Sequence, residues 1–98
     1  MHIEIYGKQE CDLCHSARKK INVMLKKWSM DEDIEVKFMD TDTVDGAAEA
    51  DFFDVFEIPS VMVKEGQDDV LARWDGEAPP SDELKASLEE TLQVDGAA

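Results

Sequence analysis

Two cysteines separated by two residues constrain the fold of this chain more than any other feature of its sequence. Cys11 and Cys14 follow a short stretch of β-forming residues, 2–6, and open a segment of helical periodicity that runs to about residue 28. A Cys-x-x-Cys pair at a strand-to-helix junction is typical of a redox-active dithiol. The fold must therefore bring the end of a strand and the start of a helix together at these two thiols.

The two thiols differ in their predicted surroundings. Apolar residues after the pair recur at spacings of three and four, which indicates a helix with one buried face. That face contains Cys14, Ala17, Ile21, Met24, Leu25 and Trp28. Cys11 precedes the face, at the helix N-terminus, where unpaired backbone N–H groups and the helix dipole favour a thiolate. We therefore predict that Cys11 is the exposed nucleophile and Cys14 the shielded resolving thiol.

Charged neighbours act on Cys11 in opposite directions. The helix N-terminus and Lys8 are expected to lower the pKa of the Cys11 thiol, whereas Glu10 and Asp12 are expected to raise it. The redox potential depends on the sum of these effects, so both reduction and oxidation of partner disulfides stay open.

Length and composition indicate one small globular domain. The chain has 98 residues, of which 43% are hydrophobic, enough for a single modest core. We predict one domain over 1–94 and a frayed C-terminal tail over 95–98. No apolar run reaches membrane-spanning length and no export signal is recognisable. A reducing cytoplasm is therefore the expected location, and there a cysteine pair serves redox chemistry more often than structural cross-linking.

The net charge of −14 makes nucleic acid a poor partner, because phosphate binding needs a concentrated basic surface. Acidic residues concentrate in 31–57. Basic residues gather on or near the first helical segment, at Lys8, Arg18, Lys19, Lys20, Lys26 and Lys27. The simplest interpretation is a well-solvated surface. The alternative is a separation of charge that steers a redox partner to the basic side of the site.

Periodicity elsewhere predicts a mixed α/β fold. The predicted strands are 2–6, 34–39, 61–63 and 70–74. After the first helical segment, the predicted helices are 44–56, ended by Pro59, and a last one capped by Ser81 with Leu84, Leu88 and Leu92 on one face. The first two strands, joined by a helix, should be parallel, and the last two should form an antiparallel hairpin. The expected order is βαβαββα, a four-stranded mixed sheet flanked by helices.

With this order of elements, the chain resembles small dithiol proteins of the thioredoxin-fold superfamily, and glutaredoxin-like proteins above all. The resemblance rests on the strand–Cys-x-x-Cys–helix unit, the passage 53–60 and the closing hairpin and helix, and it spans nearly the whole chain. It implies a thioredoxin-like fold in which a cis Ile58–Pro59 bond faces the disulfide and the Ile58 backbone pairs with substrate. Lys8, Ile58, Pro59 and Ser60 are then the candidate substrate-binding residues.

Three parts of the sequence depart from the family patterns. Glu10 stands where thioredoxins carry tryptophan, and Asp12-Leu13 replaces the Gly-Pro of thioredoxins and the Pro-Tyr of glutaredoxins. The region 74–80 lacks the double glycine with which glutaredoxins help to hold glutathione.

The resemblance implies a thiol–disulfide oxidoreductase that reduces protein disulfides through Cys11 and Cys14. Its expected partners are a disulfide-containing protein substrate and a recycling reductant, either a thioredoxin-type reductase or glutathione. We expect no bound cofactor, no nucleic-acid or membrane partner, and a monomer. Another possibility is a scaffold of the same fold, in which the two cysteines serve to bind a partner protein.

The same cysteines also suggest an electron carrier or a metal-binding module. Cys11 to His15 fits the Cys-x-x-Cys-His pattern of covalent haem c attachment. An iron–sulfur cluster shared between two chains is a related alternative. Zinc would need further ligands, and only His2 and His15 remain, of which His2 should lie at the far end of its strand. We expect His15 to be a surface residue of the first helical turn, and Tyr6 to lie in the core.

Overall fold

The computed structural model describes residues 1–97, and side chains as far as residue 89. The elements are β1 (His2–Gly7), α1 (Asp12–Lys27), β2 (Glu35–Asp40), α2 (Val44–Phe52), β3 (Ser60–Glu65), β4 (Asp69–Asp75) and α3 (Ser81–Ala97). The predicted order βαβαββα is confirmed. Ser81 is the first residue of α3, although a capping position before the helix was expected. The side chains of Leu92 and of the whole predicted tail, 95–98, lie outside those described, and the described backbone of α3 continues to Ala97.

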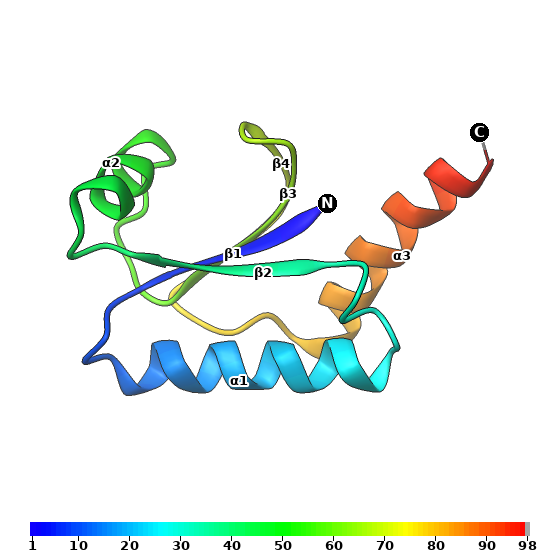
Figure 1. Ribbon diagram of the computed structural model, residues 1–98, viewed down its shortest axis with the longest axis horizontal. Coiled ribbons are helices and arrows are strands. Elements are labelled where there is room, and N and C mark those ends of the chain that lie inside the picture. The colour runs from blue at the N-terminus through cyan, green and yellow to red at the C-terminus, as the bar shows by residue number, and fades with distance from the viewer. Residues whose placement is uncertain (98) are drawn as a thin grey trace.

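The four strands form one mixed sheet in the order β2-β1-β3-β4. Strand β1 pairs in parallel with β2 and antiparallel with β3, and β3 and β4 form an antiparallel hairpin. Figure 1 shows α1 beneath the sheet and α2 above it. Both pairing predictions are confirmed. Among the described residues, no helix has the length and apolar character needed to cross a membrane.

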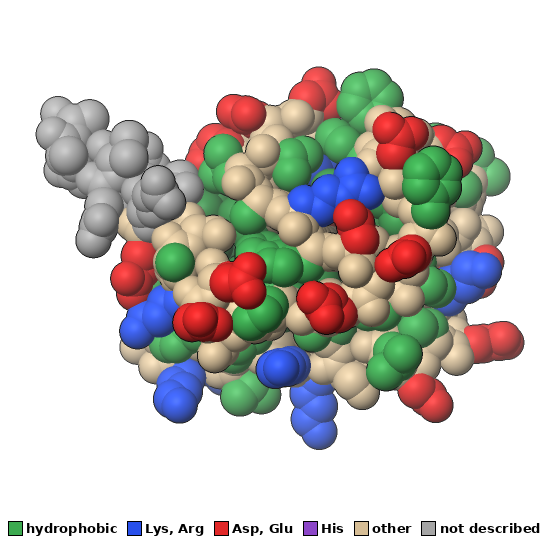
Figure 2. All heavy atoms as spheres, turned by 180° about the vertical axis from the view of Figure 1, so that it is seen from behind, with side chains coloured by type: hydrophobic (Ala, Val, Ile, Leu, Met, Phe, Trp, Pro, Cys, Tyr) green, Lys and Arg blue, Asp and Glu red, His purple; other side chains and the backbone are tan. Residues whose placement is uncertain are grey.

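Charge is unevenly distributed over the surface. In Figure 2, lysine and arginine side chains lie along the lower edge of the molecule, over α1, and carboxylates lie across the face above. The basic residues of α1, from Arg18 to Lys27, are exposed because the buried face of the helix is occupied by the apolar stripe that begins at Cys14.

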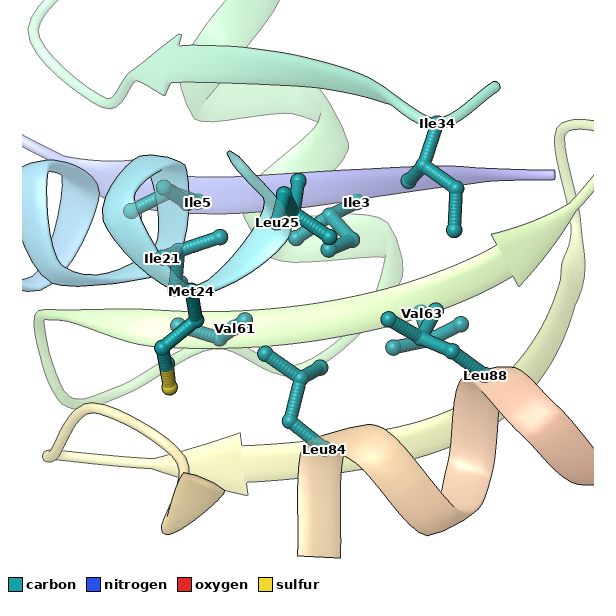
Figure 3. Close-up of a cluster of buried hydrophobic side chains, with 10 residues drawn as sticks. All are labelled: Ile3, Ile5, Ile21, Met24, Leu25, Ile34, Val61, Val63, Leu84 and Leu88. Atoms are coloured by element: carbon teal, nitrogen blue, oxygen red, sulfur yellow. The ribbon is translucent and has the colours of Figure 1, made fainter. Parts of the chain in front are cut away.

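The main core lies between the sheet and the helices α1 and α3. Alternate residues of β1 and β3 point into it, together with the apolar stripes of the two helices (Figure 3). Its buried members are Ile3, Ile5, Ile21, Met24, Leu25, Ile34, Val61, Val63, Leu84 and Leu88. This core fixes α1 against β1, so it also sets where the Cys-x-x-Cys pair lies.

A smaller cluster covers the opposite face of the sheet, under α2. It contains Tyr6, Ala50 and Met62, with Phe53 and Val55 packed against it. The prediction that Tyr6 is a core residue is confirmed. Helix α2 has only nine residues, so it covers this face incompletely.

Helix α2 ends four residues earlier than the predicted 44–56, which was wrong at this end. Asp54 takes a left-handed conformation with φ of 54°, and the Val55 N–H donates to the Ala50 carbonyl at 2.8 Å. This is a Schellman arrangement, which stops a helix and turns the chain away. The residues after it, 55–59, form an irregular segment leading to Pro59.

Candidate active site

Cys11 and Cys14 form a disulfide, with their Cα atoms 5.2 Å apart. Cys11 is the N-cap of α1, and its Sγ accepts a hydrogen bond from the Cys14 backbone N–H at 3.1 Å. Cys14 is completely buried in the apolar face of α1, whereas Cys11 is partly exposed. The expected difference in exposure between the two cysteines is therefore confirmed.

Gly7 lets the disulfide pack against the end of β1. A Cβ atom at this position would lie 2.7 Å from both Cβ and Sγ of Cys14 and 3.2 Å from the Phe38 ring. Side chains do not approach so closely, so only glycine fits. The predicted strand 2–6 stops before Gly7, and sequence reasoning did not identify this contact. The signal, a glycine between a strand and a Cys-x-x-Cys pair, does not by itself indicate such a contact.

The Ile58–Pro59 peptide bond is cis, as the resemblance implies. Pro59 is buried and lines a groove of about 220 Å³ beside α1, together with Leu13, Ala17 and Gly76. Leu13, between the two cysteines, is 70% exposed. An apolar wall therefore adjoins the disulfide on the side of the loop that follows β4.

A second groove, of about 320 Å³, lies on the α2 side, and Lys8, Phe56 and Ile58 are among the residues that line it. The structure thus brings two of the predicted substrate-binding residues, Lys8 and Ile58, to one groove and places Pro59 in the other. The Lys8 ammonium lies 3.7 Å from a carboxylate oxygen of Asp42.

The Ser60 side chain is buried and contacts other protein groups. It is fully buried, and its hydroxyl lies 2.5 Å from the Glu57 carbonyl and 3.1 Å from the Asp75 carboxylate, which share its single hydrogen. Through these contacts inside the protein, Ser60 helps to hold the cis-proline segment in place.

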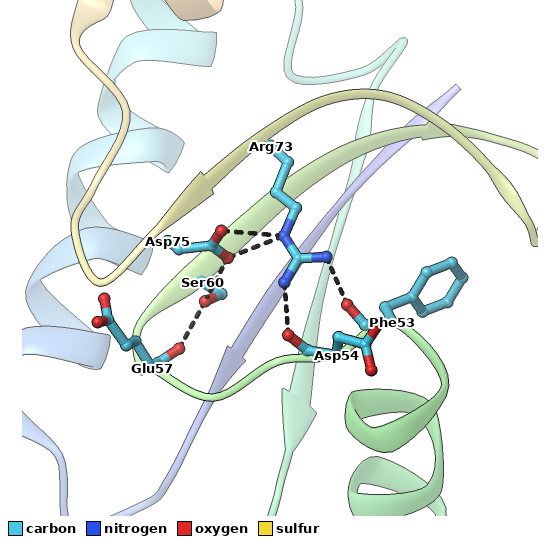
Figure 4. A network of polar contacts seen from close by, with 6 residues as sticks. All are labelled: Phe53, Asp54, Glu57, Ser60, Arg73 and Asp75. Atoms are coloured by element: carbon cyan, nitrogen blue, oxygen red, sulfur yellow. Dashed lines mark hydrogen bonds and ion pairs between the residues drawn. The ribbon is translucent and has the colours of Figure 1, made fainter.

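Arg73 holds that segment and was missed by sequence reasoning. Its Nε donates to both carboxylate oxygens of Asp75, at 2.8 and 3.1 Å. Its terminal nitrogens donate to the Phe53 carbonyl and, at 2.9 Å, to the Asp54 carbonyl (Figure 4). With Ser60, these contacts tie both ends of 53–60 to β4. Strand alternation places Arg73 and Asp75 on one face, but no local pattern indicates their partners.

His15 lies in the first turn of α1 and is partly exposed, as predicted, but it also makes specific contacts. Its ring stacks on Phe38, with centroids 5.7 Å apart, and its Nε2 lies 2.7 Å from the Gln9 carbonyl. The Arg18 guanidinium also lies over the Phe38 ring, 5.4 Å from its centroid. His15 therefore joins the β1–α1 loop to β2. Among the described residues, no three His, Cys, Asp or Glu side chains gather as a possible metal site.

A charged pair lies buried under α2. The Lys64 ammonium, fully buried, is 2.6 Å from Glu4 Oε1, and it lies 3.4 Å from the centroid of the Phe53 ring. The Tyr6 hydroxyl donates to the same carboxylate at 2.6 Å, and His2 Nε2 lies 2.8 Å from its other oxygen. The Glu4 carboxylate is thus satisfied on both oxygens.

These contacts change the pKa values of both acids. Burial alone would raise the pKa of Glu4, but hydrogen bonds from Lys64, Tyr6 and His2 outweigh it, so that pKa is lowered. Burial, and then the hydrogen bond to the Glu4 carboxylate, raise the pKa of Tyr6. Tyr6 and Glu4 face α2, whereas Cys14 packs on the α1 side, so we regard this cluster as structural.

Comparison with known proteins identifies the fold. No family model and no curated protein sequence matches the chain. Thioredoxin 1 from Thermosipho africanus aligns over 98% of this chain and 99% of its own, with 20% identity and a TM-score of 0.73. Thioredoxin-2 of the malaria parasite covers 91% of this chain and 81% of its own, with 19% identity and a TM-score of 0.70. Mitochondrial thioredoxin 3 from Saccharomyces cerevisiae covers 90% and 76%, with 17% identity and a TM-score of 0.65.

The sequence favoured glutaredoxin-like proteins, and that finer likeness stays a prediction. The sheet order, the cis Ile58–Pro59 bond and the disulfide at the start of α1 agree with the structural matches. The chain is a small dithiol protein of the thioredoxin fold.

Proposed function

We propose that the protein is a thiol–disulfide oxidoreductase that reduces disulfides of protein substrates. The observation that carries the proposal is the Cys11–Cys14 pair itself. Cys11 is partly exposed at a helix N-terminus, Cys14 is buried one turn inside, and Pro59 of the cis-proline segment shares a groove with Leu13, the residue before Cys14. This arrangement suits a nucleophile that meets a substrate and a resolving thiol that does not.

The reaction is a pair of thiol–disulfide exchanges. In the dithiol form, the Cys11 thiolate attacks one substrate sulfur, so a Cys11–substrate bond forms and the substrate S–S bond breaks. The leaving sulfur takes up a proton. Cys14, once deprotonated, attacks Cys11 Sγ and displaces the second substrate sulfur, which is protonated in turn. The substrate gains two electrons and two protons, and the protein is left with the Cys11–Cys14 disulfide.

Local structure supports Cys11 as the attacking sulfur. Its Sγ already accepts the Cys14 N–H at the helix N-terminus, and the same hydrogen bond stabilises a thiolate there. Cys14 is not accessible to a substrate, because Gly7 and the apolar face of α1 enclose it.

Substrate binding is proposed at the cis-proline segment. Within the described part of the chain, no backbone hydrogen bond involves the N–H or C=O of Ile58. An extended substrate segment can pair with such free groups as an added strand would. Pro59 then supplies an apolar wall and Lys8 a positive charge at the neighbouring groove, while Ser60 supports the segment from inside.

Turnover requires a reductant for the disulfide. We propose recycling by a thioredoxin-type reductase or by glutathione, in a reducing cytoplasm, with the protein acting as a monomer and without a bound cofactor. The acidic surface disfavours nucleic-acid partners.

Trapping of the mixed disulfide tests the proposal. Reduced Cys14→Ser protein, mixed with a peptide disulfide, should gain the mass of one peptide half on Cys11, whereas Cys11→Ser should gain none. The unaltered protein should release both peptide thiols and end as the intramolecular disulfide. Absence of exchange, or haem or metal found on the cysteines of purified protein, would contradict the proposal and favour the electron carrier.

A further inference from the structure

Phe56 is the most exposed large apolar side chain among the described residues, with 88% of its surface accessible. It lies two residues before Ile58 and lines the groove that contains Lys8 and Ile58. It also borders the hollow around Arg73 and Asp75. Scattered surface hydrophobes need no explanation, but an exposed aromatic ring on the groove that contains Ile58, the proposed substrate-pairing residue, is a candidate contact for a partner.

The segment that carries Phe56 is held in place from inside. Arg73 binds the carbonyls of Phe53 and Asp54, and the Ser60 hydroxyl reaches the Glu57 carbonyl (Figure 4). Val55, the residue before Phe56, packs against the apolar cluster under α2. Its neighbour Phe56 is left on the outside, where it cannot fold back without breaking these contacts.

The disulfide and the unpaired backbone groups of Ile58 indicate that a bound substrate segment would cover the Phe56 ring. A substrate segment that pairs with the backbone of Ile58 runs beside residues 56–58. In an extended substrate segment, side chains two residues apart lie on the same face. A side chain close to the reacting cysteine of the substrate then lies over Phe56. An apolar side chain gains most from that contact, because both surfaces leave water.

We propose that Phe56 is a specificity-determining contact for protein substrates that carry an apolar side chain beside the reacting cysteine, and that Arg73 is its positioning residue. The inference rests on the proposed oxidoreductase function and specifies its substrate class.

The experiment compares three disulfides against the reduced protein. Two are peptide disulfides identical except for Leu or Ser next to the cysteine, and the third is the small reagent 5,5′-dithiobis(2-nitrobenzoate). We expect kcat/KM to favour the Leu peptide by about fivefold, the effect of burying roughly half of an apolar side chain. Phe56→Ala should abolish this preference and leave the rate with the small reagent within about twofold.

Phe52→Ala is the matched control. Phe52 is also exposed, at 68%, but it lies at the end of α2 and does not line the groove with Ile58. The preference for the Leu peptide should survive this substitution.

Arg73→Met tests the positioning role. It should reduce the Leu preference through KM, leave the rate with the small reagent unchanged, and add nothing to Phe56→Ala in the double variant. Arg73→Lys, which keeps the charge but not the forked geometry, should fall between. If Arg73→Met does not fold, as judged by circular dichroism, Arg73→Lys and Asp75→Asn serve in its place.

Two results would overturn the inference while leaving the proposed function intact. One is retention of the Leu preference in Phe56→Ala, and the other is an Arg73 variant that slows all three disulfides equally. No exchange of the unaltered protein with any of them would refute the proposed function, and the inference with it.

Discussion

At the scale of single residues, the buried pair of Glu4 and Lys64 is the feature with the largest expected effect on stability. The Lys64 ammonium is inaccessible to solvent and has Glu4 as its only carboxylate partner among the described residues. Glu4→Leu would leave this charge buried and unpaired, which typically costs about 3–5 kcal/mol. We expect a loss of that size in the free energy of unfolding, measured by urea denaturation.

The double variant separates the charge from the packing. Glu4→Leu with Lys64→Met replaces the pair by apolar side chains of similar volume and should recover most of the loss, because neither charge remains. Glu35→Leu, at an exposed position of β2, should change stability by less than about 0.5 kcal/mol. A double variant as unstable as Glu4→Leu would contradict this account.

The lowered pKa of Glu4 also predicts how stability depends on pH. In the unfolded chain Glu4 returns to its ordinary pKa of 4.5, so below that value the unfolded state binds more protons than the folded state. The stabilisation is complete above pH 4.5 and is lost as the pH falls through the lower folded value. Urea midpoints from pH 7 down to about pH 3 should fall less steeply for Glu4→Gln than for the unaltered protein. Parallel curves would show that Glu4 is not the group responsible.

These residues show where sequence reasoning stops at this scale. Alternation places Glu4 and Tyr6 on one face of β1 and predicts Tyr6 in the core, which is correct. It does not reveal that the face is covered by α2, or that Lys64, sixty positions along the chain, supplies the counter-charge. Only the pairing of β1 with β3 brings them together.

At the scale of elements, the end of α1 offers a test of the left-handed cap. Ser29 has φ of 58°, and the Met30 N–H donates to the Leu25 carbonyl at 2.8 Å. Glycine adopts this conformation without the steric cost that a side chain incurs. Ser29→Gly should therefore raise the free energy of unfolding by about 0.5–1 kcal/mol.

The control substitution should change the free energy of unfolding in the opposite direction. Ser16 is an exposed serine in the interior of α1, where glycine is a poor helix former, so Ser16→Gly should lower stability by about 0.5–1 kcal/mol. The same exchange would thus stabilise at one position and destabilise at the other. Two shifts of the same sign would argue against the assigned helix end.

The contact between β1 and α1 gives a prediction for the disulfide. Gly7→Ala places a methyl group 2.7 Å from the Cys14 sulfur, so either β1 or the helix start must move. We expect a loss of about 1–3 kcal/mol in stability and a changed redox potential, measured by glutathione titration with thiol trapping. Gly66→Ala, at φ of 73° in open space, should lose stability without altering the potential. Equal potentials for Gly7→Ala and the unaltered protein would contradict the proposed contact.

The order and type of the elements could be predicted because strand and helix periods are local in the sequence. The end of α2 could not. The prediction continued the helix to residue 56, since Val55 and Phe56 extend its apolar pattern. The structure instead ends it at Phe52, with a left-handed Asp54, and Arg73 in β4 binds the carbonyls left free there. The deciding contact lies about twenty residues further along the chain.

At the scale of the whole molecule, the distribution of charge can be stated more sharply than the sequence allowed. The basic side chains of α1 lie on its outer face, along the lower edge of the molecule in Figure 2. The segments near the disulfide are acidic by contrast. Besides Lys8, those segments carry Glu10, Asp12, Glu57, Asp75 and Glu77. Lys8 is close to Asp42, and Asp75 is bound by Arg73. Within the described part of the chain, the other four carboxylates have no ion pair.

Such a field should favour cationic substrates. We expect a peptide disulfide flanked by lysines to react faster than a matched one flanked by glutamates, by at least about tenfold at low salt. The ratio should shrink as salt rises from ~0.01 M to ~1 M, because the screening length falls from ~30 Å to ~3 Å. Using the ratio of two peptides cancels any change in the intrinsic reactivity of Cys11.

Two charge variants locate the source of the preference. At ~0.1 M salt, where the screening length is ~10 Å, Glu57→Gln with Glu77→Gln should reduce the ratio. Glu32→Gln with Glu35→Gln, the same change of charge at exposed positions before and within β2, should leave it almost unchanged. A faster reaction with the glutamate-flanked peptide would mean that the basic face of α1 steers the partner, which is the alternative that the sequence raised. An equal rate for both peptides at low salt would leave the net charge of −14 with a role in solvation alone. The outcome thus decides between local and global charge, because only charges within a screening length of Cys11 can act on an approaching disulfide.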